Sequence, residues 1–169
     1  MRYFFTADQH FGHVNIIKYT NRPFKDVSEM NTEIIRRHNE VVGKDDTVVH
    51  AGDFAWGKHD VRERYIEPLN GHHMFVKGSH DRWLRDEKQI MELNIEGQHI
   101  VVCHYAMRVW PRSHYNSWQV YGHSHGKLKP AGKQWDVGVD NNQFYPIAFE
   151  ELRAIMDDSP DNFNLVKGR

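Results

Sequence analysis

Short apolar runs alternate with longer amphipathic segments along the chain. The short runs are rich in β-branched and aromatic residues and are bounded by turn-forming residues, a pattern typical of strands. We predict six strands, at residues 3–7, 47–51, 73–77, 99–103, 119–121 and 135–139. Because helical patterns separate these strands, we expect an α/β fold whose sheets are largely buried.

The clearest helix is predicted over residues 28–42. Asp26 and Glu29 have the spacing of a capping box at its start, and Gly43 is expected to end it. Spacings of three and four residues predict one buried face, formed by Ile34, Ile35, His38, Val41 and Val42. Weaker patterns predict further helices at 60–67, 86–93 and 149–156, the last ending before Pro160.

The composition excludes several classes of protein. A chain of 169 residues favours one domain, here residues 1–169. Its 22 basic and 23 acidic residues give a net charge of −1, whereas a protein built to wrap duplex DNA usually has a strongly positive surface. No apolar run is long enough for a transmembrane helix, and the first run reaches Asp8 too soon for a signal peptide. The single cysteine, Cys103, excludes an internal disulfide and favours a reducing, cytoplasmic location.

Residues that can bind metal ions follow almost every predicted strand. They are Asp8 and His10, Asp53, His80 and Asp81, His104, and the pair His123 and His125. Because sites in open α/β sheets form at the carboxyl ends of strands, we expect these side chains to converge. Members of an i, i+2 pair point the same way in extended backbone, which strengthens this expectation.

The ligand types favour an open catalytic centre over a structural zinc site. Structural zinc sites favour cysteine ligands that lie close together in sequence, whereas these are His and Asp spread over more than half of the chain. They suit Mn²⁺, Fe, Zn²⁺ or Ni²⁺. Their number exceeds what one tetrahedral ion needs, so two ions are plausible.

The ordered motifs resemble those of the calcineurin-like metallophosphoesterase superfamily. They are Asp8-x-His10, Gly52-Asp53, Gly78-Ser79-His80-Asp81, His104 and Gly122-His123-x-His125. Phe11-Gly12-His13 and Asn21-Arg22-Pro23-Phe24 resemble a compact bacterial and phage-type branch. The resemblance implies a four-layer α/β/β/α sandwich of two mixed sheets flanked by helices. It also implies a hydrolase in which a hydroxide bridging two metal ions attacks a small phosphomonoester or phosphodiester.

The resemblance also implies a role for each matching residue. The first ion is held by Asp8, His10 and His125, the second by His104 and His123, and both are bridged by Asp53. His80 faces the substrate and acts as general acid or hydrogen-bond donor, and Asp81 orients His80 through a hydrogen bond. Manganese is the expected metal, with iron, zinc and nickel as alternatives.

Ser79 departs from the family pattern, which has an asparagine at this position as a ligand of the second ion. A serine hydroxyl is shorter and binds a divalent ion weakly unless it is deprotonated. We therefore expect a looser second site, or one completed by water. Natural drift, a deliberate substitution and a catalytically weakened form of the enzyme are all compatible with this change.

The charge pattern predicts where a phosphorylated substrate binds. Residues 97–135 contain no Asp or Glu, and a positive wall beside the metals would attract phosphate. Arg108 and Arg112 follow a metal-binding motif closely, so substrate contact and a solvated surface are equally open for them. The same two interpretations, substrate contact or solvated surface, are open for Arg22. His13 either extends into the substrate pocket or caps a helix.

Other residues are predicted to play mainly structural roles. His38 and His50 are expected to be buried, and Cys103 to be a small core residue. Trp110 and Trp118 are most simply core aromatics, with base stacking as the alternative.

The sequence leaves two rival functions open. The first is a nuclease acting on short nucleic acid, since the net charge argues against stable binding of long duplexes. The second is a non-catalytic interaction scaffold with a weakened metal site. For the favoured enzyme the expected partner is a phosphorylated small molecule or a nucleotide, without membrane association, and the oligomeric state is not predicted.

Overall fold

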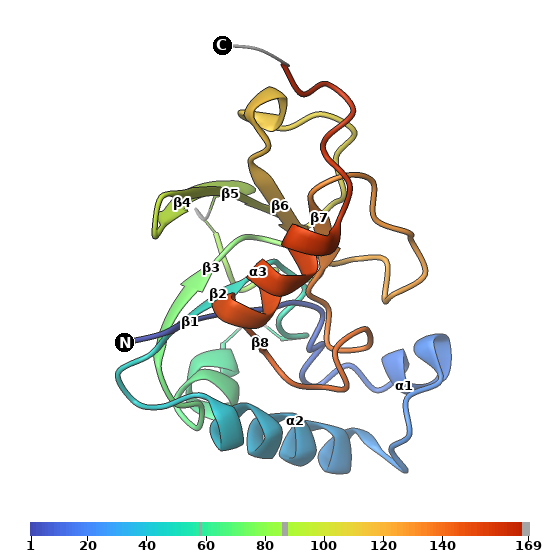
Figure 1. Ribbon diagram of the computed structural model, residues 1–169. Coiled ribbons are helices and arrows are strands. Elements are labelled where there is room, and N and C mark those ends of the chain that lie inside the picture. Colours follow the sequence, from blue (N-terminus) through green and yellow to red (C-terminus); the bar gives the residue numbers. More distant parts are fainter. Residues whose placement is uncertain (58, 86–87, 167–169) are drawn as a thin grey trace.

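Two four-stranded sheets form the centre of the protein (Figure 1). The computed structural model describes residues 1–57, 59–85 and 88–166. The first sheet has the order β3-β2-β1-β8 and the second the order β4-β5-β6-β7. The strands are β1 (Tyr3–Thr6), β2 (Thr47–His50), β3 (His72–Phe75), β4 (Ile90–Ile95), β5 (Gln98–Cys103), β6 (Trp118–Tyr121), β7 (Gln134–Asp136) and β8 (Ile147–Ala148).

Both sheets are mixed, and their parallel strands decide where the site forms. In the first sheet β1, β2 and β3 are parallel and β8 is antiparallel. In the second sheet β5, β6 and β7 are parallel and β4 is antiparallel. Just beyond β1, Ala7 pairs with Gly138 beyond β7, and the Val139 N–H donates to the Ala7 carbonyl at 3.0 Å. This bridge brings the carboxyl ends of the two sets of parallel strands together.

The main core lies between the sheets. Phe5 and Val49 of the first sheet and Ile100 and Val120 of the second belong to one buried cluster. Helix α3 (Phe149–Asp158) adds Phe149, Leu152 and Met156 to the same cluster. This arrangement confirms the predicted α/β class with two mixed sheets flanked by helices.

A second core lies between the first sheet and helices α1 (Ile16–Thr20) and α2 (Val27–Val41), and α2 runs along the lower edge of Figure 1. Met30 and Ile34 on α2 share this cluster with Phe11 and Phe54. Asp26 caps α2 by accepting the Glu29 N–H at 2.9 Å, as predicted. The segment predicted as a helix at 60–67 contains a π-helical turn, η1 (Arg62–Ile66), and α1 was not predicted.

The helix predicted at residues 86–93 is wrong. Residues 90–95 form β4, which pairs with β5 as an antiparallel hairpin, and residues 86 and 87 lie outside the described residues. The exposed and half-buried side chains of β4 alternate with the period of a strand. Glu96 and Gly97 both have positive φ, 50° and 83°, which is the two-residue turn that a tight hairpin favours. The helical spacing of this segment is weak, and the turn at Glu96 and Gly97 outweighs it.

The loop after β5 is held to the second sheet by two buried glutamines of β6 and β7. Between β5 and β6 it contains the short 3₁₀ helix η2 (Ser113–Tyr115). Gln119 accepts the Met107 N–H at 2.9 Å and Gln134 donates to the Met107 carbonyl, and both glutamine side chains are buried.

Across the described residues, no helix combines the length and apolar character needed to cross a bilayer.

Candidate metal centre

Side chains from five strand ends converge on one place. Three groups of potential ligand atoms occur, and within each group all atoms lie within 4.8 Å of one another. The groups are Asp8, His10 and His125; His10, Asp53 and His80; and Asp53, His104 and His123. The expected convergence of side chains beyond both sets of parallel strands is therefore present in the structure.

Asp53 lies between the first and third of these groups. One of its carboxylate oxygens, Oδ2, is 3.7 Å from Nε2 of His10 and 3.2 Å from Nε2 of His104. A single carboxylate within reach of imidazoles from both sides is the geometry that a bridging ligand requires.

The backbone at the cluster is strained. Asp8, His10, Asp53, His123 and His125 all have positive φ, between 49° and 67°. This left-handed region costs a residue with a side chain about 1–2 kcal/mol, although Asp and His tolerate it better than most. The i, i+2 pairs are therefore not extended as expected, and His123 and His125 contribute to different groups. Strain concentrated at one place indicates a functional site.

Two glycines allow the strand ends to approach closely. A Cβ on Gly52 would lie 2.6 Å from Nδ1 of His104, and Gly52 has φ of +92°. A Cβ on Gly78 would collide with the backbone nitrogen and the carboxylate of Asp53. Neither position can carry a side chain without displacing a residue of the cluster.

Hydrogen bonds orient two of the histidines. Nδ1 of His104 lies 2.9 Å from the Ala51 carbonyl, and Nδ1 of His125 lies 2.7 Å from Oδ2 of Asp140. Because both partners are acceptors, each Nδ1 carries a proton, and in the neutral ring Nε2 then keeps the lone pair that a metal ion needs. Histidines that bind metals are held in this way.

Three buried polar atoms of the cluster have no hydrogen-bond partner among the described residues. They are Oδ1 of Asp8, Nε2 of His10 and Nε2 of His104. Leaving such an atom unpaired costs about 1–3 kcal/mol. A carboxylate oxygen and two imidazole nitrogens are ligands that Mn²⁺, Fe²⁺ or Zn²⁺ accepts, so the residues present fit a divalent cation.

The electrostatics of the cluster also fit a cation. Burial raises the pKa of Asp8 to about 7, because an isolated carboxylate is poorly solvated there. Burial would lower the pKa of His104, but the neighbouring Asp53 and Asp8 carboxylates outweigh it and raise this pKa to about 9. Positive charge beside these buried carboxylates stabilises their ionised forms. A divalent ion supplies more positive charge than one imidazolium.

The family model for the calcineurin-like phosphoesterase superfamily domain matches residues 1–135 of this chain. The chain belongs to this superfamily. A calcineurin-like domain with clustered Asp and His side chains is, in general terms, a metal-dependent phosphoesterase.

Several known proteins are similar to this chain. An uncharacterised protein of Methanocaldococcus jannaschii is 31% identical over 160 residues, which cover 89% of each chain. A solved structure of a protein of unknown function from Aquifex aeolicus matches with a TM-score of 0.71 at 23% identity, covering 91% of this chain and 98% of that chain. A mutant Vps29 from Entamoeba histolytica matches with a TM-score of 0.48 at 19% identity, covering 82% and 73% of the two chains.

His80 and Asp81 of the calcineurin-like domain are not paired as expected. Asp81 accepts the N–H groups of Phe54 at 2.9 Å and Gly78 at 2.9 Å, and the indole N–H of Trp83 at 3.2 Å. No hydrogen bond joins it to the His80 ring among the described residues. The prediction that Asp81 orients His80 directly is therefore wrong, because the buried carboxylate is used to hold the loops that carry the site.

His80 and Ser79 both contact Asp53. The His80 N–H donates to Oδ1 of Asp53 at 2.8 Å, while the His80 ring is 37% exposed and lines the cavity over the cluster. The Ser79 hydroxyl donates to both carboxylate oxygens of Asp53, at 3.3 and 3.2 Å. At the position where the family has asparagine, serine thus contacts the bridging candidate.

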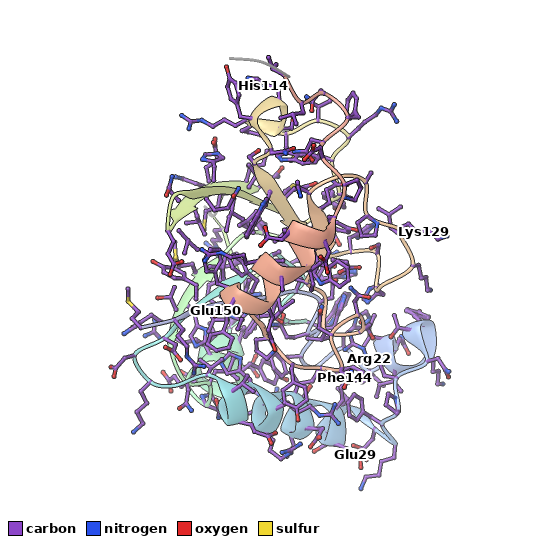
Figure 2. All side chains as sticks on the ribbon, viewed as in Figure 1. Arg22, Glu29, His114, Lys129, Phe144 and Glu150 are labelled. Carbon is purple, nitrogen blue, oxygen red and sulfur yellow. The ribbon has the colours of Figure 1, made fainter. Side chains whose placement is uncertain are left out.

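Arg22, for which substrate contact was one of two interpretations, has a buried guanidinium that is bonded within the protein. It donates to the carbonyls of Asp8 and Gln9, at 2.6 and 2.9 Å, and to both oxygens of Asp140, at 2.9 and 2.7 Å. Figure 2 shows Arg22 beside Phe144, whose ring centre lies 5.7 Å from the guanidinium carbon. Asp140 in turn binds His125, so Arg22 and Asp140 link two of the candidate ligands. Only the position of Asp140 after a predicted strand hinted at this role.

The cavity over the cluster has a volume of about 680 Å³. His13 lines it, in agreement with one of the two interpretations of this residue. Arg108 and Arg112 are not among its lining residues, and the guanidinium of Arg108 instead lies 5.5 Å from the ring centre of Phe163. Lys127 is the basic residue that lines this cavity in the described part of the chain.

Proposed function

We propose that the protein is a binuclear metal-dependent phosphoesterase that hydrolyses small phosphomonoesters or phosphodiesters. One observation carries the proposal: Asp53 lies between the group of Asp8, His10 and His125 and the group containing His104 and His123. When bound, two divalent ions, with Mn²⁺ favoured, would polarise the phosphate and supply an activated water.

The residues of the chain would act around the bound ester as follows. His10, His104 and His125 present Nε2 atoms to the centre. His80 lies at the cavity surface with a partly exposed ring, where it can donate a proton or a hydrogen bond to the leaving oxygen. Lys127, at the cavity wall, favours entry of an anionic group.

The charge and size of the cavity favour a small substrate over nucleic acid. A groove that tracks a nucleic-acid backbone needs a series of basic side chains. Here Lys127 lines the cavity, while Arg108 and Arg112 do not. The net charge of −1 agrees with a small phosphorylated molecule or a nucleotide as the partner.

The interaction scaffold is less well supported than the enzyme. The buried, unpaired ligand atoms of Asp8, His10 and His104 argue for a site that binds a cation. A scaffold in which the metal site had decayed would be free to replace or pair them.

The test combines metal analysis with a panel of esters. We expect about two equivalents of divalent metal and hydrolysis of phosphomonoesters or phosphodiesters. His80→Ala should keep the metal but lose activity by about 10²–10⁴-fold, the typical worth of general acid catalysis. His10→Ala is the matched control, and it should lose metal and activity together.

Two outcomes would overturn the proposal, and a third would change the role assigned to His80. Metal-loaded protein without activity on any ester would favour the scaffold. A preference for oligonucleotides over small esters would favour the nuclease. Loss of metal in His80→Ala would make His80 a ligand.

A further inference from the structure

The wall of the cavity beside the metal cluster is apolar and exposed. Val14, Tyr19 and Trp56 all line this cavity and are 61%, 67% and 47% exposed. Single exposed apolar residues are common, but three gathered on the wall of one cavity mark a binding surface. The same cavity is lined by His10 and His80 of the metal cluster. We call Val14, Tyr19 and Trp56 the aromatic wall, after its two aromatic members, Tyr19 and Trp56.

The aromatic wall is held in place by the metal cluster itself. His13 stacks on Trp56 with ring centres 4.8 Å apart at 19°, and the Tyr19 ring meets His13 edge-on at 6.3 Å. Nδ1 of His13 lies 3.2 Å from Nδ1 of His10. One imidazole therefore separates the indole from a candidate metal ligand.

The backbone also fixes Trp56. Its N–H donates to the Phe11 carbonyl at 2.8 Å, and Phe11 pairs with Ala55 in an isolated bridge. Gly12 packs so closely that a Cβ there would lie 3.1 Å from the Trp56 carbonyl. A surface that is rigid before binding loses little entropy when a flat ring packs on it.

The two ends of the cavity suit different parts of one molecule. Asp and His side chains at one end suit a phosphate held by metal ions, and the aromatic wall suits a planar, weakly polar group. The His13 ring lies between them, with its centre 5.3 Å from that of His10 and 4.8 Å from that of Trp56. The indole of Trp56 also lies 5.4 Å from the ring of His80, so a planar group bound on the aromatic wall would be next to the end of the cavity that holds the phosphate.

We propose that the aromatic wall binds the base of a nucleotide, so that the substrates are phosphate esters of nucleosides rather than of sugars without a base. This inference rests on the proposed phosphoesterase function and names its substrate class. Trp110 and Trp118, for which base stacking was the alternative, are both buried and cannot take this role. With Lys127 as the lining cation, a single nucleotide fits better than a longer strand.

The test compares substrates that differ only in the base. We expect kcat/KM for adenosine monophosphate to exceed that for ribose 5-phosphate, because stacking of a base on an aromatic side chain strengthens binding by roughly 5- to 150-fold. Trp56→Ala should lower the ratio of the two values about tenfold or more. Tyr115→Ala, an exposed aromatic outside this cavity, is the matched control and should leave the ratio unchanged.

A binding measurement separates this inference from the proposed function. The NMR signals of adenosine monophosphate should broaden or shift when metal-free protein is added. Trp56→Ala should weaken this binding about tenfold or more. If no ester is hydrolysed but this binding is present and depends on Trp56, the phosphoesterase fails while the base site stands. Equal efficiency for the two substrates, an equal loss on both in Trp56→Ala, or a preference for phenyl phosphate over the nucleotide would overturn the base site.

Discussion

Replacing Asp140 by asparagine tests whether a buried ion pair prepares the metal centre. Asp140 accepts hydrogen bonds from Arg22 and from Nδ1 of His125. Asparagine has nearly the same shape but lacks the charge, and it has one acceptor oxygen instead of two. If that oxygen takes the place of Oδ1, which accepts only from Arg22, the amide N–H groups take the place of Oδ2 and point at His125. His125 can then accept only by moving its proton to Nε2, which removes the lone pair that a metal needs.

The size of the effect follows from the electrostatics of Asp140. Burial opposes its ionisation, but the hydrogen bonds from His125 and Arg22 lower its pKa to about 2. Against an ordinary value of about 3.9, this shift corresponds to roughly 2–3 kcal/mol in favour of the carboxylate. We expect Asp140→Asn to lower the free energy of unfolding of the metal-free protein by about that amount. Loss of a residue that orients a metal-binding histidine should also weaken metal binding about 10- to 100-fold.

Two assays measure these quantities separately. Urea unfolding of the metal-free protein gives the loss of stability, and titration of metal-free protein with Mn²⁺, followed by calorimetry, gives the loss of affinity. Asp157→Asn, which removes the same charge from an exposed position on α3, is the matched control and should change neither. Unchanged metal affinity in a destabilised Asp140→Asn would show that Asp140 supports only Arg22. If neither quantity changed, the reasoning about the pair would be refuted.

Three further predictions concern other parts of the site and fold. Ser79→Asn should tighten binding of the second ion at least tenfold (about 1.4 kcal/mol) by adding an amide ligand, and an unchanged Mn²⁺ titration would remove serine as a weakness of the site. Gly78→Ala should lower the free energy of unfolding by about 1–3 kcal/mol more than Gly97→Ala and should weaken metal binding. Both changes are measured in urea and by metal titration, and the difference arises because only Gly78 packs against Asp53. Burial lowers the pKa of His38 to about 4, so its stabilising effect is complete above pH 6.5 and is lost as the pH falls towards 4. Between pH 7 and 5, protonation of His38 should lower the free energy of unfolding of the metal-free protein by about 2 kcal/mol. His38→Gln keeps a hydrogen-bond donor to the Asn70 carbonyl but cannot be protonated, so urea unfolding should show a smaller loss of stability over the same pH range.

The positions of the strands could be predicted because strand-forming runs and their ends are local features. β-branched residues followed by Gly and then Asp or His mark both the end of a strand and the start of a ligand loop, as at β2 and Asp53. The parallel arrangement then places those ends together, so the convergence of Asp8, Asp53, His104 and His125 could be predicted before any coordinates. Where two local signals conflicted, as at β4, the turn at Glu96 and Gly97 decided the structure and the weak helical spacing did not.

The partners of individual side chains were decided only by the tertiary structure. Arg22 and Asp140 are 118 residues apart, and nothing near either of them in sequence indicates that they form a buried pair. Asp81 likewise binds the backbone of Phe54 rather than its neighbour His80. Tyr19 and Trp56 lie in separate segments, and no hydrophobic pattern in either segment indicates that the two side chains line one cavity. The physical reason is that local sequence determines strand, turn and ligand type, whereas the environment of a charge or an aromatic ring depends on which distant segments pack around it.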